Sequence, residues 1–188
     1  MKILLVNNNT IHLSALSQTL AGHDVQIQTY QPGLKLNDYD KDLVILSGGG
    51  GEGQEINDVI DVNTYWYEDE MQFVRTTKKP VIGICMGFEV MAKAHGQDVP
   101  TLGKLIYETG TFEATKRGWQ LLGRKNFSQS EAHSWHVPQA PKGFEVLAES
   151  ENGIEIIFNP QRRQIGTQFH PELSGSLNMS QLFHTVLG

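Results

Sequence analysis

Three short aliphatic runs, at residues 2–6, 42–46 and 80–84, constrain the fold of this chain more than any other feature. Strands that are apolar on both faces are typical of a parallel sheet covered by helices. The first run is followed by Leu13 and Leu16 at helical spacing and then by a strand-like segment at residues 25–30, which together form a β-α-β pattern. The sequence therefore predicts an α/β fold with a mostly parallel central sheet and helices on both faces.

The remaining segments extend this prediction. Helices are expected at residues 63–77, 86–95 and 178–187, because apolar residues recur there at helical spacing. From about residue 103, short β-prone segments alternate with glycine and proline, which predicts a small antiparallel extension. With 188 residues, 39% of them hydrophobic, the chain is expected to form a single domain over residues 1–188.

The composition excludes several classes of function. The formal net charge is −6, and the 15 lysines and arginines are scattered along the chain, so no nucleic-acid partner is expected. No apolar stretch approaches the roughly 18 residues of a membrane span, which predicts a soluble, cytoplasmic protein without a membrane partner. A single cysteine excludes an internal disulfide and any cysteine-rich zinc site, so no bound metal is expected.

That cysteine, Cys85, lies in the segment Gly-Ile-Cys-Met-Gly at residues 83–87, between an expected strand and an expected helix. A sharp strand-to-helix turn exposes a nucleophile above the carboxyl edge of a sheet, and small neighbours allow strained backbone there. The helix N-terminus is expected to lower the pKa of the thiol, and the amide of Met86 is expected to face a developing oxyanion. The alternative is that Cys85 is a small buried hydrophobic residue.

The second candidate element is Gln-Phe-His-Pro-Glu at residues 168–172, directly after a strand-like segment. His170 can deprotonate a thiol and later protonate a leaving amine, and Glu172 can fix the tautomer of its ring. In extended backbone the two side chains fall on the same side, and Pro171 stiffens the link. The alternative is a histidine and a glutamate on the surface without a chemical role.

A glycine run at residues 48–51, preceded by Ser47, follows the second aliphatic run. Its amides could line an anion-binding nest beside the cysteine. The run lacks the Lys-Ser/Thr ending of a phosphate-binding loop, and the alternative is an ordinary flexible loop.

Taken together and in this order, the three elements resemble those of the class I, triad-type glutamine amidotransferases, and the resemblance covers nearly the whole chain. It implies the flavodoxin-like three-layer fold of that family and hydrolysis of the side-chain amide of glutamine. Cys85 would form a γ-glutamyl thioester, His170 would act as base and acid, and Glu172 would orient it. The amides of Gly49 and Met86 would form the oxyanion hole.

The family pattern also implies a partner. Its members pass ammonia to a synthase or synthetase, so ATP and magnesium are expected only on that partner and no cofactor is expected in this chain. The loop at residues 47–49 is most similar to the GMP synthase version. The segment at residues 133–134 is most similar to the anthranilate and aminodeoxychorismate synthase version, so the ammonia acceptor stays open.

Substrate-binding residues are implied by the same resemblance. Backbone groups near Ser134 and Trp135 would hold the amino-acid end of glutamine. Glu89 stands where the family usually has glutamine, on a side chain that faces substrate. A carboxylate there could bind the ammonium of the substrate, repel its carboxylate, or alter the pKa of the thiol.

Three other interpretations remain. A γ-glutamyl hydrolase-like enzyme would use the same triad without transferring ammonia. A non-catalytic regulatory protein would keep the fold while Glu89 prevents glutamine binding. A relative of other flavodoxin-like families with a cysteine at a similar turn fits the residues around His170 poorly.

Overall fold

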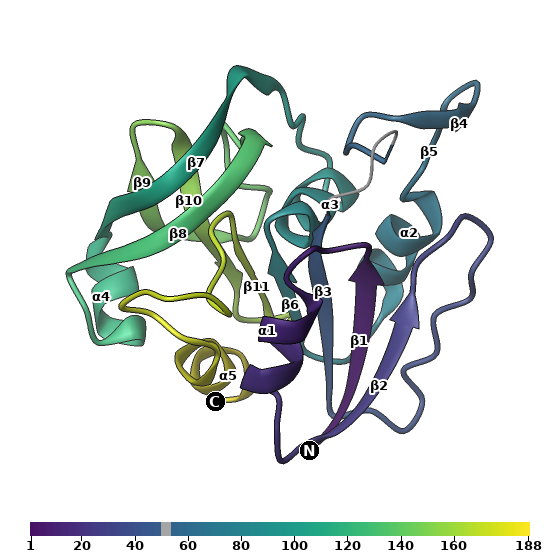
Figure 1. Ribbon diagram of the computed structural model, residues 1–188, viewed down its shortest axis with the longest axis horizontal. Helices are drawn as coiled ribbons and strands as arrows, with labels where there is room; N and C mark the ends of the chain where they lie inside the picture. Colours follow the sequence, from purple (N-terminus) through teal and green to yellow (C-terminus); the bar gives the residue numbers. More distant parts are fainter. Residues whose placement is uncertain (50–53) are drawn as a thin grey trace.

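The computed structural model describes residues 1–49 and 54–188, and in those residues nine strands form one sheet flanked by helices (Figure 1). The strands of this sheet are β1 (Lys2–Asn8), β2 (Asp24–Thr29), β3 (Leu43–Gly49), β6 (Val81–Ile84), β7 (Thr101–Ala114), β8 (Asn126–Trp135), β9 (Glu145–Ser150), β10 (Gly153–Asn159) and β11 (Gln164–Thr167). The helices are α1 (Leu13–Thr19), α2 (Glu68–Thr76), α3 (Met86–Ala94), α4 (Lys116–Leu122) and α5 (Met179–Leu187). The strand order is β2-β1-β3-β6-β11-β10-β9-β7-β8.

One half of the sheet is parallel, and it contains all three aliphatic runs. β1 pairs in parallel with β2 and β3, β3 with β6, and β6 with β11. Ile84 of β6 lies opposite Thr167 of β11, so two segments that are distant in sequence end at the same edge of the sheet. The predicted parallel core is confirmed, and β1 and β3 run two to three residues further than the aliphatic runs.

The other half of the sheet is antiparallel, from β11 through β10, β9 and β7 to β8. The predicted antiparallel extension is confirmed, but β7 and β8 are longer than the short segments expected, at 14 and 10 residues. β7 is exposed over most of its length. The strand β7 carries no continuous apolar face, so its extent is set by its backbone hydrogen bonds to β8.

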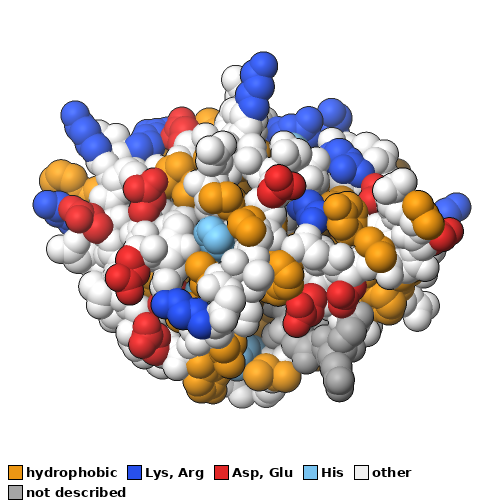
Figure 2. Space-filling model, turned by 90° about the horizontal axis from the view of Figure 1, so that it is seen from above, with side chains coloured by type: hydrophobic (Ala, Val, Ile, Leu, Met, Phe, Trp, Pro, Cys, Tyr) orange, Lys and Arg blue, Asp and Glu red, His pale blue; other side chains and the backbone are white. Residues whose placement is uncertain are grey.

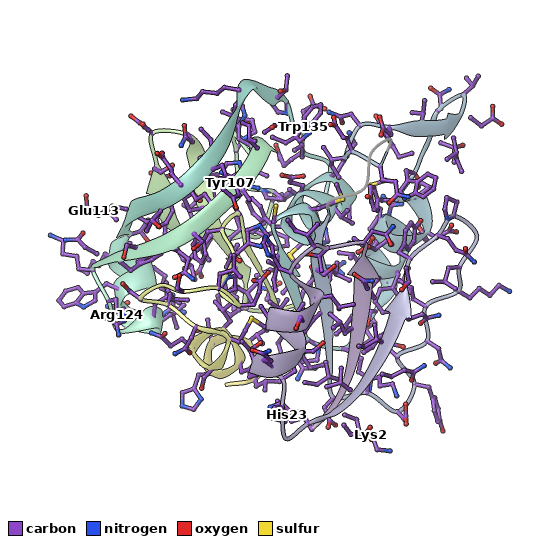
Figure 3. The ribbon with its side chains drawn as sticks, in the orientation of Figure 1. Lys2, His23, Tyr107, Glu113, Arg124 and Trp135 are labelled. Carbon is purple, nitrogen blue, oxygen red and sulfur yellow. The ribbon has the colours of Figure 1, made fainter. Side chains whose placement is uncertain are left out.

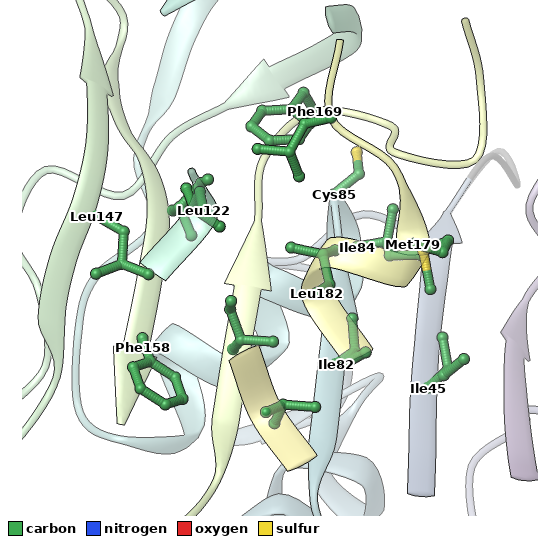
Figure 4. Packing of buried hydrophobic residues seen from close by; sticks show 14 of the residues in the cluster. Ile45, Ile82, Ile84, Cys85, Leu122, Leu147, Phe158, Phe169, Met179 and Leu182 are labelled. Carbon is green, nitrogen blue, oxygen red and sulfur yellow. The ribbon is translucent and has the colours of Figure 1, made fainter. Parts of the chain in front are cut away.

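Two hydrophobic cores cover the two faces of the sheet. One contains Leu16 of α1 and Leu182 of α5, and the other contains Val74 of α2 and Phe88 of α3. Figure 4 shows the first core, in which Cys85 lies beside Ile84 at the end of β6. Helices therefore lie on both faces, as the sequence predicts.

The segment before α2 differs from the prediction. A helix was expected over residues 63–77, but α2 begins at Glu68, and β4 (Val59–Asp61) pairs with β5 (Thr64–Tyr65) before it. Asn63, with φ of 62°, makes the left-handed turn of this hairpin, which a helix cannot accommodate. Within the described ranges no helix is long and apolar enough to cross a membrane.

Candidate active site

Cys85 occupies a strained turn between β6 and α3. Its φ and ψ are 48° and −107°, and its N–H donates to the carbonyl of Thr167 at 2.7 Å. A Cβ at Gly83 would lie 2.5 Å from the carbonyl oxygen of Gly87, and a Cβ at Gly87 would lie 2.4 Å from the carbonyl oxygen of Leu46. Both glycines are therefore required by close backbone packing, and the neighbouring strand holds the cysteine in its unfavourable conformation.

The environment of the thiol differs from the one expected. Sγ donates to the carbonyl of Ala132 at 3.6 Å, and Cys85 is only 7% exposed. Burial raises the pKa of Cys85 well above its usual range, and the negative charges of Glu89 and Glu172 raise it further, while the amide of Met86 lowers it. The expectation of a lowered pKa was wrong, because desolvation and two carboxylates outweigh the helix N-terminus. The free thiol therefore needs a base to become a nucleophile.

His170 and Glu172 form a buried pair. Nδ1 of His170 is 2.9 Å from Oε1 of Glu172, and the two residues are 2% and 6% exposed. Because the carboxylate accepts a hydrogen bond from Nδ1–H, Nε2 is left as the acceptor nitrogen of the neutral ring. Nε2 is buried and has no partner among the described residues. The pair thus has the tautomer that a general base requires.

Gly48 lies close to both His170 and Cys85. A Cβ built at Gly48 would lie 3.0 Å from Cε1 of His170 and 3.5 Å from Cβ of Cys85. The two candidate side chains therefore approach the same point near the end of β3, and only a glycine leaves that space open. A Cβ built at Gly49 would lie 2.6 Å from Sδ of Met86, while Gly50 and Gly51 of the glycine run lie outside the described residues.

A cavity of about 390 Å³ opens beside the cysteine. Six of the residues singled out in the sequence line it: Gly49, Cys85, Met86, Glu89, Ser134 and Trp135. Figure 3 shows Trp135 near the end of the molecule toward which the parallel strands point. The structure therefore brings the candidate oxyanion and substrate-binding residues together around the thiol, with the histidine pair close to Cys85.

Glu89 is buried in the wall of this cavity, at 2% exposure. Its Oε1 accepts a hydrogen bond from Nε2 of Gln168 at 2.9 Å. Burial raises the pKa of Glu89, and Gln168, His133 and His170 lower it in part. The carboxyl group is thus tied to the strand end that leads to His170.

Two histidines that the sequence analysis did not single out also belong to the site. His133 lines the cavity, with Nδ1 2.7 Å from the carbonyl of Trp135 and Nε2 3.1 Å from Oε1 of Glu131. Burial alone would lower the pKa of His133, but the hydrogen bond to Glu131 and that to Trp135 raise it overall. Both ring nitrogens face acceptors, which fits an imidazolium. No apolar alternation marks it in the sequence, because the buried positions that precede it in β8 include Gln129 and Glu131.

The other histidine is His12, in the turn after β1. Its ring meets that of His170 edge to face, with centroids 4.8 Å apart. Burial lowers the pKa of His12, and the nearby His170 lowers it further. Nothing in its sequence position indicated this contact, since 158 residues separate the two histidines.

The fold and these residues define a three-layer α/β protein of the nucleophile-elbow type, with a cysteine and a His-Glu pair at the carboxyl edge of the sheet. The chain belongs to the class I glutamine amidotransferase family, whose model matches residues 4–187. The fold class inferred from the sequence is thereby confirmed.

Individual relatives agree with this assignment. The chain is 32% identical over 145 residues to a glutamine-hydrolyzing GMP synthase subunit of Sulfolobus acidocaldarius, covering 74% of this chain and 72% of the relative. It is 28% identical over 132 residues to the pyocyanine-specific anthranilate synthase component 2 of Pseudomonas aeruginosa, covering 70% and 62%. Against two longer relatives named GMP synthase [glutamine-hydrolyzing], from Campylobacter fetus and Campylobacter lari, the match spans 25% of their length.

The fold also matches solved structures. A crystal structure described as a GMP synthase subunit protein of Thermoplasma acidophilum superposes with a TM-score of 0.78 at 19% identity, covering all of this chain and 92% of that one. At this identity the likeness establishes the fold.

Proposed function

We propose that the chain hydrolyses the side-chain amide of glutamine and delivers the ammonia to a partner synthase or synthetase. The observation that carries this proposal is the buried His170–Glu172 pair, 2.9 Å apart, whose Nε2 has no partner among residues 1–49 and 54–188 and lies beside the cysteine turn. Family membership supplies the reaction class, and the cavity beside Cys85 supplies space for an amino acid.

The reaction would proceed in two halves. His170 accepts the thiol proton through Nε2 while Sγ of Cys85 attacks the carboxamide carbon, and the same proton then passes to the leaving nitrogen, which departs as ammonia. A γ-glutamyl thioester remains. Water, deprotonated by His170, attacks it, and the proton returns to sulfur as glutamate leaves. Glu172 stabilises the imidazolium in both halves.

Because the pKa of Cys85 is raised, this mechanism requires His170 to remove the proton of the thiol. Little thiolate exists before substrate binds, so proton transfer to His170 accompanies attack on the amide. The oxyanion of the tetrahedral intermediate would be held by the amides of Gly49 and Met86, which line the same cavity as Sγ.

The far end of the cavity would bind the amino-acid part of glutamine. Glu89 would bind the ammonium of the α-amino acid through its carboxyl group, while His133, paired with Glu131 and the carbonyl of Trp135, forms part of the wall. Ser134 and Trp135 would contribute backbone contacts. The carbonyl of Ser134 accepts from Thr101 and that of Trp135 contacts His133, so both are held in place.

Exposed hydrophobic side chains lie at the mouth of the cavity. Leu105 lines the cavity and is 66% exposed, and Tyr107 on the same strand is 74% exposed. Figure 2, which looks onto this end of the molecule, shows hydrophobic side chains around a histidine near the middle of the face. Such a surface suits a protein partner. We propose that ATP and magnesium act on that partner and that this single-domain chain needs no cofactor of its own. The ammonia acceptors of GMP synthase and of anthranilate synthase, the enzymes named for its relatives, both stay candidates.

The test is release of glutamate and ammonia from glutamine by the purified chain, with and without candidate synthase partners. Cys85→Ala and His170→Asn should abolish turnover, whereas His184→Asn, on the exposed face of α5, serves as the matched control and should not. Stimulation by one synthase would identify the pathway. Absence of both turnover and thioester with every candidate partner would refute the proposal.

A second candidate function rests on Glu89. Its carboxyl group lies where substrate would bind, and a regulatory protein that binds a synthase without hydrolysing glutamine would need such a change. Glu89→Gln discriminates: a large gain of glutaminase activity favours the regulatory role, and a loss favours Glu89 as a substrate-binding residue. A γ-glutamyl hydrolase-like enzyme would instead turn over rapidly without any partner.

A further inference from the structure

Glu70 is a fully buried carboxyl group in the first turn of α2, and Figure 1 shows this helix beside the end of β1. Its Oε1 accepts a hydrogen bond from Nδ2 of Asn8 at 3.1 Å. Oε2 of Glu70 and Oδ1 of Asn8 are both buried without a partner among the described residues. The pair therefore leaves one oxygen on each side chain unsatisfied.

A proton on Oε2 would satisfy both orphaned atoms at once. A carboxylate offers only acceptors and would leave two oxygens of facing side chains without a donor. A neutral carboxylic acid can donate from Oε2 to Oδ1 of Asn8 while Oε1 accepts from Nδ2, which gives two parallel hydrogen bonds between acid and amide. Burial supports the neutral form, because it raises the pKa of Glu70 to about 8.

The surroundings of Glu70 offer no other donor or countercharge within the described residues. The titratable groups facing it are Tyr30, just after β2, and Tyr67, just before α2. The hydroxyl of Tyr30 donates to the carbonyl of Trp66 and that of Tyr67 to the carbonyl of Gln54, so both protons are already used. Neighbouring Asp69 is also acidic, and no ion pair of Glu70 occurs in the described part of the chain.

Asn8 connects Glu70 to the end of β3, which bears the proposed oxyanion donor Gly49. Its Nδ2 also donates to the carbonyl of Ser47 at 3.3 Å, and its backbone N–H donates to Oγ of Ser47 at 2.8 Å. Oγ of Ser47 in turn donates to the carbonyl of Gly48 at 2.8 Å, and Asn8 lies opposite Gly49 in the sheet. Movement of the Asn8 side chain would therefore move the segment that contacts His170 and Met86.

We propose that Glu70 is a positioning residue that, as a neutral acid paired with Asn8, holds the end of β3 at residues 47–49 in its catalytic geometry. The proposal rests on the glutaminase function proposed above. It assigns a role in catalysis to a carboxyl group that does not touch the substrate cavity. It also implies that the end of β3 becomes less firmly held when Glu70 ionises.

The test compares Glu70→Gln with Glu70→Met. Glutamine keeps both hydrogen bonds to Asn8 without an ionisable proton, so kcat at pH 7 should stay within about threefold of the wild type, and the decline of kcat near pH 8 due to Glu70 should disappear. Methionine removes both bonds and should lower kcat by about 10- to 100-fold with little change in KM, as expected for a displaced oxyanion donor. Glu68→Gln removes an exposed carboxylate from the same helical turn and should leave both parameters unchanged.

An infrared difference spectrum between wild type and Glu70→Gln gives a readout independent of turnover and of the methionine variant. A protonated carboxyl band at pH 6 to 7 that is lost above pH 8 supports the proposal. A carboxylate at pH 6, or a glutamine variant as impaired in kcat as the methionine variant, overturns it. A wild-type chain without glutamine turnover under any condition would count against the proposed function, while the infrared band still decides the protonation of Glu70.

Discussion

Replacement of Glu70 by glutamine should remove a large part of the pH dependence of folding stability. The pKa of Glu70 is about 8 in the folded protein, against an ordinary value of 4.5. Because the folded-state pKa is the higher one, folding takes up a proton between these values. The stabilisation is fully present below about pH 4.5 and is lost as the pH rises toward and through 8.

The magnitude follows from the two pKa values. Each pKa unit corresponds to about 1.4 kcal/mol, so the free energy of unfolding of the wild type should fall by about 4 kcal/mol more than that of Glu70→Gln between pH 5 and pH 9. This loss is of the same order as the whole stability of many domains. Cys85 and Glu89 also have raised pKa values, but they are present in both proteins and cancel in the comparison.

The assay is urea unfolding followed by tryptophan fluorescence at half-unit pH steps, with Glu68→Gln as the control for loss of an exposed carboxylate from the same turn. Curves for wild type and Glu70→Gln should converge at acid pH and diverge in the alkaline range. Parallel curves would refute the reasoning, because they would mean that Glu70 is ionised in the folded protein or becomes solvated at no cost.

Three further predictions concern the site and the core. Glu172→Gln should lower kcat by about 10²- to 10⁴-fold with KM nearly unchanged, because His170 loses the carboxylate that fixes its tautomer; steady-state kinetics would check this, and an unchanged kcat would contradict it. Gly87→Ala should destabilise the fold by at least about 1–3 kcal/mol, because its Cβ would lie 2.4 Å from the carbonyl oxygen of Leu46; a wild-type urea midpoint would argue against that contact. Phe169→Ala should destabilise by about 3–5 kcal/mol, since the ring is fully buried against two other phenylalanines; a calorimetric Tm close to that of the wild type would rule this out.

The parallel half of the fold could be predicted from the sequence because its strands are apolar on both faces. Burial and periodicity agree there, as at Val81 and Ile82 of β6. β7 could not be delimited in the same way, because most of its residues are exposed and its pairing with β8 depends on backbone hydrogen bonds between distant segments. The helix before residue 77 was placed too early because Tyr65 fits helical spacing, although it lies in a hairpin strand.

The residues around the thiol could be identified from sequence motifs, but the shifts of their pKa values could not. The raised pKa of Cys85 depends on burial and on two carboxylates that only the tertiary structure brings close. Glu70 was missed for a similar reason, because Glu68, Asp69 and Glu70 look like a solvated acidic first turn. Only the third of them faces the interior. A sequence pattern of charges does not show which member of a cluster is buried.

The position of β11 has a consequence for biosynthesis. This strand is among the last elements of the chain, yet it occupies an interior place in the sheet between β6 and β10. A nascent chain that has emerged from the ribosome as far as residue 160 already contains the cysteine but neither the strand that fixes its turn nor the histidine that follows. The thiol therefore stays without His170 until β11 inserts, and a product truncated before that strand would lack the proposed active site.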